Sequence, residues 1–307
     1  MTRRLHLLLL ASAAAAAPKP PASPQGKRKR VAAWLASGSV DQLQASVDGR
    51  QAPIERVLGP QDDLVLLLVL DLAGDITRID AARQAAAAAI EQLPAYAWVG
   101  VLSAQDGLRA LADPAPDRAA AIAAIQSAPT TGRAGFLETV DPAARLASAL
   151  LHKARVRTAV LFLTDSEIGN YREDFTNPVI NYSDTRDLSR RFPDALVREK
   201  SARLASTLAP SDAPVFAVHL AFLRDRLNEA YQTGLQQIVE STGGQAWFCR
   251  NLAEIPDTVA AAFGRILSMY SIDLRLPAGV PKNATLQFSG AELQYRGRIV
   301  AQAWQRD

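Results

Sequence analysis

The sequence predicts an α/β protein with a doubly wound, mostly parallel sheet and a small antiparallel β unit. Continuous apolar runs alternate with stretches of helical periodicity between residue 62 and about residue 270. Shorter segments in which polar and apolar residues alternate flank that region on both sides. The chain has 307 residues, 49% of them hydrophobic, which is sufficient for a sizeable core.

The charged residues are unevenly distributed. Residues 1–30 contain seven lysines and arginines and no acid, which leaves 27 bases and 31 acids in the remainder. The part expected to fold is therefore mildly acidic, and we expect no nucleic-acid partner. Cys249 is the only cysteine, which excludes an internal disulfide, and its apolar neighbours predict a buried side chain.

Residues 1–17 have the order of a secretory signal peptide: Arg3 and Arg4, then an apolar run over 5–10, then small residues over 13–17. From this order we expect a secreted or periplasmic protein. The alternative for these residues is an alanine-rich N-terminal helix. No later stretch reaches about 18 uninterrupted apolar residues, so we expect no transmembrane segment after signal cleavage.

Residues 18–30 are predicted to be a proline-rich basic linker, with four prolines and the tetrad Lys-Arg-Lys-Arg over 27–30. The tetrad either contacts an anionic surface such as lipid or peptidoglycan or is a solvated spacer. Residues 31–60 are predicted to contain a β-hairpin, because apolar residues at 43, 45 and 47 alternate with polar ones up to Asp48-Gly49.

Residues 61–270 are predicted to form the α/β domain. Its buried strands are expected at 64–70, 97–102, 158–164, 214–220 and 245–249. Helices are expected from apolar residues at helical spacing: Ile79 to Leu93; Leu146, Leu150 and Leu151 after a cap at Asp141-Pro142; Leu227 to Val239; and Ile255 to Ile266. Residues 271–307 are predicted to be strands that pack with 31–60.

Two of the most apolar strands end in an acid, Asp71 and Asp165, and Asp75 follows in the first of these loops. Ligands of open α/β sheets bind beyond the carboxyl ends of the strands. Three carboxylates at one edge repel each other unless a proton or a cation neutralises them, and oxygen ligands suit Mg²⁺ or Ca²⁺. Alternatively, Asp75 caps the next helix and Asp71 binds backbone amides.

This order of elements resembles a von Willebrand factor A domain. The resemblance rests on an apolar strand that ends in Asp71, a later one that ends in Thr164-Asp165, and a helix stopped by Thr242-Gly243-Gly244 before a short strand. The hairpin with Val47-Asp48-Gly49 is similar to that of the secreted bacterial proteins related to this family. The resemblance covers roughly residues 40–270 and implies a Rossmann-like sheet in a non-enzymatic protein-binding or adhesion module.

The same resemblance implies a metal-ion-dependent adhesion site. Asp71 and Asp165 match its first and last aspartates, and Thr131 is the choice for its threonine. The two serine positions of the family are occupied here by Ala73 and Asp75, so the site is degenerate. Both a bound Mg²⁺ or Ca²⁺ and a metal-free site held by the same loops remain open.

The segment from 166 to about 193 is long for a connection inside such a sheet and begins at the same edge. It is rich in residue types that are enriched at protein interfaces. We predict that it contacts a protein partner in the cell envelope or outside the cell through Tyr171, Arg172, Phe175 and Tyr182. A solvated surface insertion is the alternative.

Two other functions remain as alternatives. A Mg²⁺-dependent phosphatase similar to the haloacid dehalogenases would use Asp71 as its nucleophile, but that family needs a second aspartate two residues later, where this chain has Ala73. A structural envelope component would dock through the terminal β unit instead. Motifs for other hydrolases are missing, and His219, inside an apolar strand, is expected to be a core residue.

Overall fold

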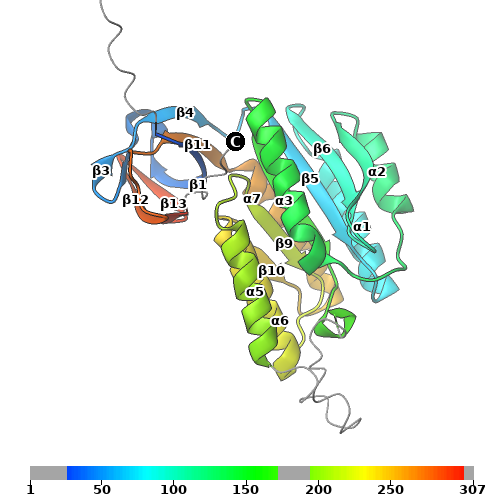
Figure 1. Cartoon of the computed structure of the whole chain (residues 1–307). Coiled ribbons are helices and arrows are strands. Elements are labelled where there is room, and N and C mark those ends of the chain that lie inside the picture. Colours follow the sequence, from blue (N-terminus) through cyan, green and yellow to red (C-terminus); the bar gives the residue numbers. More distant parts are fainter. Residues whose placement is uncertain (1–25, 172–193, 301–307) are drawn as a thin grey trace, which may run out of the picture.

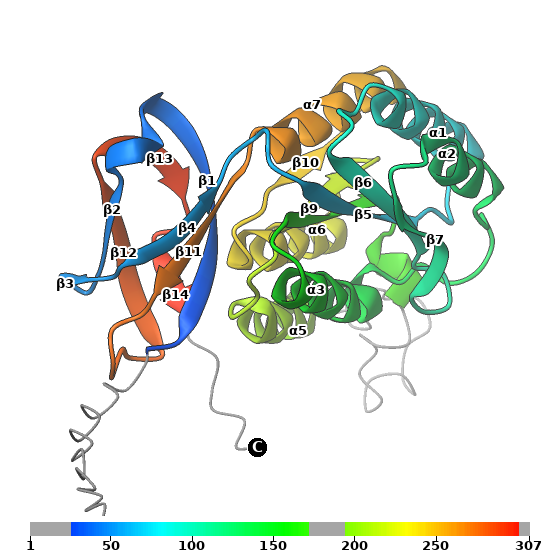
Figure 2. The ribbon, with the colours of Figure 1, turned by 90° about the horizontal axis from the view of Figure 1, so that it is seen from above.

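The computed structural model describes residues 26–171 and 194–300 (Figure 1). The expected signal peptide and residues 18–25 of the expected linker lie outside these ranges. The described chain forms an α/β domain and, beside it, a β unit built from both ends of the chain (Figures 1 and 2). No helix in these ranges is both long and apolar enough to cross a membrane.

The α/β domain is built on a six-stranded sheet with the order β10-β9-β8-β5-β6-β7. Neighbouring strands are parallel except for β7, which runs antiparallel to β6 at one edge. This confirms the predicted mostly parallel sheet. The strands are β5 (Leu64–Asp71), β6 (Ala97–Ser103), β7 (Arg109–Ala115), β8 (Arg157–Thr164), β9 (Val215–His219) and β10 (Ala246–Phe248).

Helices cover both faces of this sheet (Figure 2). One face packs against α1 (Ile76–Glu91), α2 (Arg118–Ser127) and α7 (Ile255–Leu267), and the other against α3 (Phe136–Lys153), α5 (Asp194–Leu208) and α6 (Arg226–Ser241). Alternate residues of β5 enter the two cores: Leu66 and Leu68 lie in the first, Leu67 and Val69 in the second. Burial on both faces explains the uninterrupted apolar run of this strand.

The β unit consists of two four-stranded antiparallel sheets, β13-β1-β11-β4 and β14-β12-β2-β3. Strands from the two chain ends pair with each other, β1 with β11 and β13, and β2 with β12, which confirms the predicted antiparallel unit. The strands are β1 (Arg28–Gly38), β2 (Gln44–Val47), β3 (Arg50–Gln51), β4 (Ile54–Leu58), β11 (Tyr270–Arg275), β12 (Asn283–Ser289), β13 (Ala291–Tyr295) and β14 (Arg298–Val300).

The Asp48-Gly49 hairpin is present between β2 and β3. Both residues have positive φ, 48° and 74°, as a two-residue turn that matches strand twist requires. In contrast, the basic tetrad is not a spacer, because β1 begins at Arg28. Lys29 and Arg30 form ion pairs with Asp212 and Asp273, acids far away in the sequence that local composition does not reveal.

Three elements that the sequence did not predict, and the start of α3, differ from expectation. The structure adds β7, α2 and α5, whose short or alanine-rich sequences have weak apolar periodicity. Helix α3 begins at Phe136 after Gly135, so Pro142 lies inside the helix and not at its start. Leu146 is 40% exposed and does not face inward, whereas Leu151 is buried as expected.

One arginine joins the β unit to the α/β domain. Arg157, at the start of β8, is fully buried. Its guanidinium donates hydrogen bonds to the carbonyls of Pro60 and Asp62 at 2.7 Å, Leu267 at 2.9 Å and Met269 at 3.1 Å. The chain passes between the two units at these two places, between β4 and β5 and between α7 and β11. Arg157 therefore holds both crossings together.

We predict that Arg157→Met lowers the free energy of unfolding by about 3 kcal/mol, because it leaves several buried carbonyls without a donor. Urea denaturation followed by circular dichroism measures this loss. The matched control is Arg109→Ala at an exposed position on β7, which is expected to change stability by less than about 0.5 kcal/mol. Equal stability of the two variants would contradict the role of Arg157.

Candidate functional site

The carboxyl ends of the parallel strands form the edge of the sheet that faces away from the β unit (Figure 1). The loops that follow β5, β8, β9 and β10 meet along this edge. Asp71 ends β5 and Asp165 follows β8, which is the neighbour of β5 in the sheet. The backbone N–H of Asp165 donates to the carbonyl of Asp71 at 3.2 Å, so the two predicted aspartates do lie side by side.

Asp71 is fully buried, and both of its carboxylate oxygens accept hydrogen bonds. Oδ1 accepts from the backbone N–H of Gly135 at 2.7 Å, and Oδ2 accepts from the hydroxyl of Thr164 at 2.7 Å. Burial raises the pKa of Asp71 to about 6, although these hydrogen bonds act in the opposite direction. The carboxylate thus joins the ends of β5 and β8 to the start of α3.

Asp165 performs a similar task for the loop after β5. Its two oxygens accept hydrogen bonds from the backbone N–H groups of Ala73 at 3.0 Å and Gly74 at 2.7 Å. A Cβ on Gly74 would lie 2.8 Å from one of these oxygens, so a larger residue would displace the carboxylate. Burial raises the pKa of Asp165, and the backbone hydrogen bonds offset part of that shift.

A relay of hydroxyl groups extends from Asp71 into the core. The Thr164 and Ser166 hydroxyls are 2.7 Å apart, and the Ser166 and Tyr231 hydroxyls are 2.7 Å apart. Because Thr164 donates to the Asp71 carboxylate, Ser166 donates to Thr164 and Tyr231 donates to Ser166. Sequence reasoning missed Ser166 and Tyr231, since Tyr231 belongs to an apolar stripe that predicted only a core position.

The remaining predicted ligands do not join these two carboxylates. Asp75 is exposed and caps α1, where Oδ1 accepts from the backbone N–H of Thr77 at 2.8 Å and from its hydroxyl at 2.7 Å. These hydrogen bonds lower the pKa of Asp75. The capping alternative is therefore the one that the structure contains. Thr131 is exposed in the loop before α3.

The residues predicted to bind a partner need one correction. Tyr171 is fully buried and cannot contact a partner: its ring lies 5.6 Å from that of Tyr231, and its hydroxyl accepts the backbone N–H of Leu137 at 3.2 Å. It fills the core because the short turn η2 (Ile168–Tyr171) folds back onto α6. Arg172, Phe175 and Tyr182 lie outside the described residues.

Two core predictions are confirmed. His219 is fully buried, with its Nε2 atom 2.7 Å from the carbonyl oxygen of Ser166 and its Nδ1 atom accepting the backbone N–H of Ala221. Burial lowers its pKa, so the ring is neutral. Cys249 is buried as well, and burial raises the pKa of its thiol.

Hydrogen bonds within the protein already engage most of the predicted metal ligands at this edge. Each oxygen of Asp71 and Asp165 already accepts a hydrogen bond from the protein, Ala73 supplies no side-chain oxygen, and the Asp75 carboxylate binds its own helix. Within residues 26–171 and 194–300, no three acidic, histidine or cysteine side chains are grouped as metal ligands. A Mg²⁺ or Ca²⁺ site at Asp71, Asp75, Asp165 and Thr131 stays a prediction.

The same edge carries exposed apolar side chains. Ile76 at the start of α1 is 56% exposed, Phe222 after β9 is 40% exposed, and Leu252 in the turn η3 (Leu252–Glu254) is 43% exposed. The loops that carry them are in contact: the Phe222 N–H donates to the carbonyl of Cys249 at 2.8 Å, and α1 touches η3. Single apolar residues in separate loops have no periodicity, so the sequence did not reveal this group.

No protein-family model matches the chain, and no curated protein matches it. The alternation of strands and helices, with Asp71 and Asp165 together at one edge, is the arrangement that the sequence resemblance implied. The fold is similar to that of a von Willebrand factor A domain.

Solved structures similar to this chain include proteins described as von Willebrand factor A domains. One is a von Willebrand factor type A protein from Catenulispora acidiphila, with 11% identity and a TM-score of 0.47 over 92% of this chain and 75% of that protein. Another is proximal thread matrix protein 1 from the mussel byssus, with 11% identity and a TM-score of 0.44 over 70% of this chain and 48% of that protein. A structure of that mussel protein contains a zinc-occupied adhesion-site motif.

A third similar structure is the von Willebrand factor domain of the pilus tip protein Mfa5 from Porphyromonas gingivalis, with 11% identity and a TM-score of 0.42 over 67% of this chain and 94% of that domain. Likeness at this level concerns only the fold. Neither the zinc of the mussel protein nor the tip location of Mfa5 is carried over to this chain.

The buried carboxyl of Asp71 predicts a pH effect on stability. Between about pH 4 and pH 6 the folded protein binds a proton that the unfolded chain, with its ordinary pKa of 3.8, has released. Ionisation of Asp71 therefore lowers stability as the pH rises from about 4 to 7, by up to about 3 kcal/mol. Urea denaturation of the wild type and Asp71→Asn across this range measures the effect as the change in their stability difference. A difference independent of pH would contradict the raised pKa.

Proposed function

We propose that this chain is an exported, non-enzymatic protein-binding module that contacts its partner through the carboxyl edge of the large sheet. The observation that carries this proposal is the group of Ile76, Phe222 and Leu252 at that edge. They are three of the seven large exposed hydrophobic residues in the described part of the chain. Gathered exposed apolar side chains are a feature of interaction sites.

The surroundings of this group indicate the character of the partner. Asp75 and Asp225 are exposed helix caps at the same edge, after β5 and β9 respectively. Exposed Arg224, Arg226 and Arg250 lie in the same loops, so the rim carries charges of both signs. An apolar centre with such a rim favours a partner segment with an apolar centre and polar flanks. Recognition of this kind needs no metal. This agrees with the hydrogen bonds that Asp71, Asp165 and Asp75 already accept from groups of the protein itself.

The burial of Asp71 supports a non-enzymatic role over the phosphatase alternative. A nucleophilic carboxylate has to reach the phosphorus atom of its substrate, but Asp71 is fully buried and both of its oxygens hold protein donors. Ala73 also lacks the carboxyl group that a general acid would need at that position. The phosphatase hypothesis therefore requires the loops at this edge to rearrange.

Export rests on the sequence of residues 1–17. The basic start, the apolar run and the small residues follow one another in the order that secretion requires. The partner would then be a protein of the cell envelope or of the surroundings of the cell.

Replacing the apolar residues at the edge should remove partner binding. The double variant Ile76→Ser with Phe222→Ser is expected to weaken retention of a specific envelope protein on the immobilised mature chain at least about tenfold, because buried apolar anchors dominate interface energies. The matched control is Leu146→Ser, which alters a side chain of equal 40% exposure on α3. Equal retention by both variants, measured by quantitative mass spectrometry, would show that this edge is not the docking surface.

Calorimetric titration of Mg²⁺, Mn²⁺ and Ca²⁺ into the mature protein tests the metal-independent part of the proposal. We expect no saturable heat, since Asp71 is fully buried, Ala73 supplies no side-chain ligand and Asp75 caps its own helix. Saturable binding that Asp165→Ala abolishes would establish the metal site instead. Hydrolysis of a generic phosphate ester that Asp71→Asn abolishes, assayed at the same Mg²⁺ levels, would overturn the non-enzymatic reading.

A further inference from the structure

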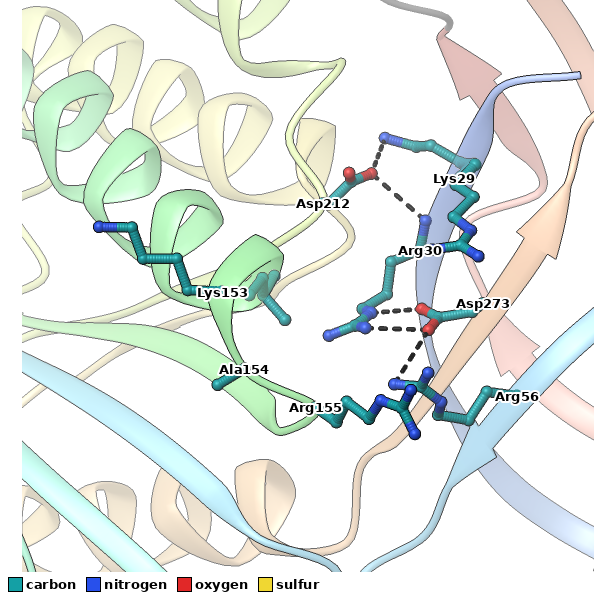
Figure 3. A pocket seen from close by; sticks show the side chains of 10 residues that line it. Lys29, Arg30, Arg56, Lys153, Ala154, Arg155, Asp212 and Asp273 are labelled. Atoms are coloured by element: carbon teal, nitrogen blue, oxygen red, sulfur yellow. Dashed lines mark hydrogen bonds and ion pairs between the residues drawn. The ribbon is translucent and has the colours of Figure 1, made fainter. Parts of the chain in front are cut away.

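A basic pocket of about 270 Å³ lies at the junction between the β unit and the α/β domain (Figure 3). One wall comes from β1, β4 and β11, and the other from the end of α3, the connection to β8, and the loop that contains Asp212. Its side chains include six bases and only two acids: Arg28, Lys29, Arg30, Arg56, Lys153 and Arg155, with Asp212 and Asp273. Arg28 also pairs with Glu55 at 2.6 Å, outside the lining residues, so the excess of positive charge is smaller than the lining residues alone suggest.

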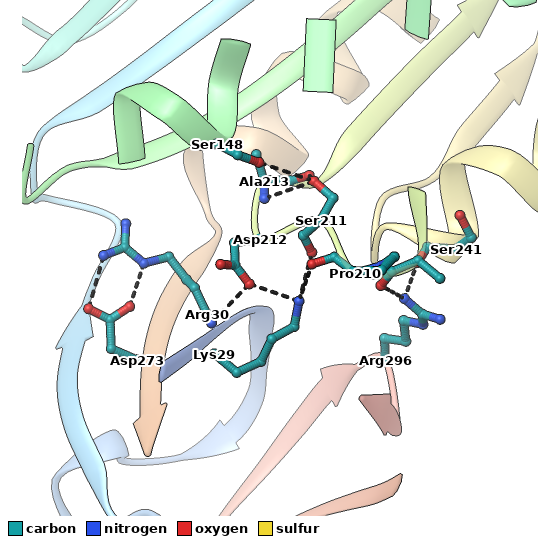
Figure 4. A network of polar contacts seen from close by, with 11 residues as sticks. Lys29, Arg30, Ser148, Pro210, Ser211, Asp212, Ala213, Ser241, Asp273 and Arg296 are labelled. Carbon is teal, nitrogen blue, oxygen red and sulfur yellow. Dashed lines mark hydrogen bonds and ion pairs between the residues drawn. The ribbon is translucent and has the colours of Figure 1, made fainter. Parts of the chain in front are cut away.

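Two of the bases have structural tasks (Figure 4). Lys29 forms an ion pair with Asp212 at 2.8 Å and donates to the carbonyls of Pro210 at 2.7 Å and Ser211 at 3.0 Å. Arg30 binds both oxygens of Asp273 and donates to the carbonyl of Val156 at 2.9 Å. Asp212 and the three carbonyls fasten β1 to the α/β domain, whereas Asp273 on β11 holds Arg30 within the β unit.

Arg56 has only a long ion pair to a shared acid, and Arg155 has no acid partner within the described residues. The nearest carboxylate to Arg56 is that of Asp273, at 3.8 Å, and Arg30 already binds both of its oxygens. No ion pair or side-chain hydrogen bond is made by Arg155 within the described parts of the chain. In Figure 3 the two side chains extend from opposite walls toward the same space, whereas Lys153 points away from it.

Two guanidinium groups that line one pocket and share at most part of one carboxylate's charge repel each other, although the exposure of Arg155 to water weakens this repulsion. An anion between them lowers that cost. The planar fork of arginine matches the oxygens of a phosphate group, which can accept from both walls at once. The volume exceeds that of one phosphate and leaves room for a second phosphate or a small attached group. A single carboxylate would offer one plane of acceptors and less charge.

We propose that this pocket binds the phosphate group of a small molecule or of a lipid headgroup, held between Arg56 and Arg155. The pocket lies at the amino ends of the large sheet, beside Arg157, whereas the candidate partner surface lies at the carboxyl ends. The inference is therefore independent of the proposed protein-binding function. The junction between the two units would then bind a ligand, in addition to holding the units together.

The test is calorimetric titration of inorganic phosphate and of diphosphate into the mature protein at low ionic strength. We expect saturable binding, tighter for diphosphate, and about tenfold weaker affinity in each of Arg56→Ala and Arg155→Ala, because each variant removes a charge-assisted hydrogen-bond donor. Arg155→Lys keeps the charge without the fork and should fall between the wild type and Arg155→Ala. Arg109→Ala, at an exposed position outside the pocket, should bind as the wild type does.

A second arm distinguishes the two sources of phosphate. Stronger cosedimentation with phosphatidylglycerol vesicles than with phosphatidylcholine vesicles would indicate that the phosphate belongs to an anionic lipid headgroup. Loss of this binding in the Arg56→Ala, Arg155→Ala double variant would support the pocket as the binding site. Thermal denaturation of every variant checks that the fold is retained. The proposal fails if neither diphosphate nor the anionic vesicles bind, or if the double variant and Arg109→Ala bind equally well.

Discussion

The arrangement of this protein depends on a cation buried where its two units meet. The guanidinium of Arg157 is removed from water, at a cost that lowers its pKa, and its hydrogen bonds all go to carbonyls of the two segments that connect the units. Neither segment can move away without leaving that charge poorly solvated. The constraint fixes the β unit at the amino ends of the sheet and keeps the carboxyl ends clear. Arg155, two residues earlier, is thereby placed in the wall of the junction pocket.

The carboxyl edge is organised by charge of the opposite sign. Asp71 and Asp165 hold the loops after β5 and β8 through hydrogen bonds from backbone amides and from Thr164. Such bonds stabilise a buried carboxylate without a cation, and the hydroxyl relay to Tyr231 extends the stabilisation into the core. The loops are thus held in place by the protein itself, and the apolar side chains above them remain exposed. The two ends of one sheet consequently present different chemistry: a basic pocket at one, and an apolar surface with charges of both signs at the other.

The fold was largely predictable, but the site was predictable only in part. The continuous apolar run of β5 and the Asp48-Gly49 turn are local patterns, and both appear as expected. Asp71 and Asp165 could be placed together because neighbouring parallel strands end at a common edge. Tyr171 was misassigned, since a tyrosine after a strand has the same local pattern whether it fills the core or faces a partner. Arg157 gave no indication of its role, because charged residues at strand starts are usually solvated.

Periodicity and chain order were sufficient for the alternation of helices and strands, for the pairing of the chain ends in one β unit, and for the edge at which the two aspartates lie. These features follow from burial of apolar surface, which has a regular spacing along the chain. The partners of charged groups were decided only by tertiary structure: Lys29 with Asp212, Arg30 with Asp273, and Arg157 with four carbonyls. Hydrogen bonds and ion pairs depend on the distance between atoms in space, and the spacing of these residues in the sequence carries no information about it.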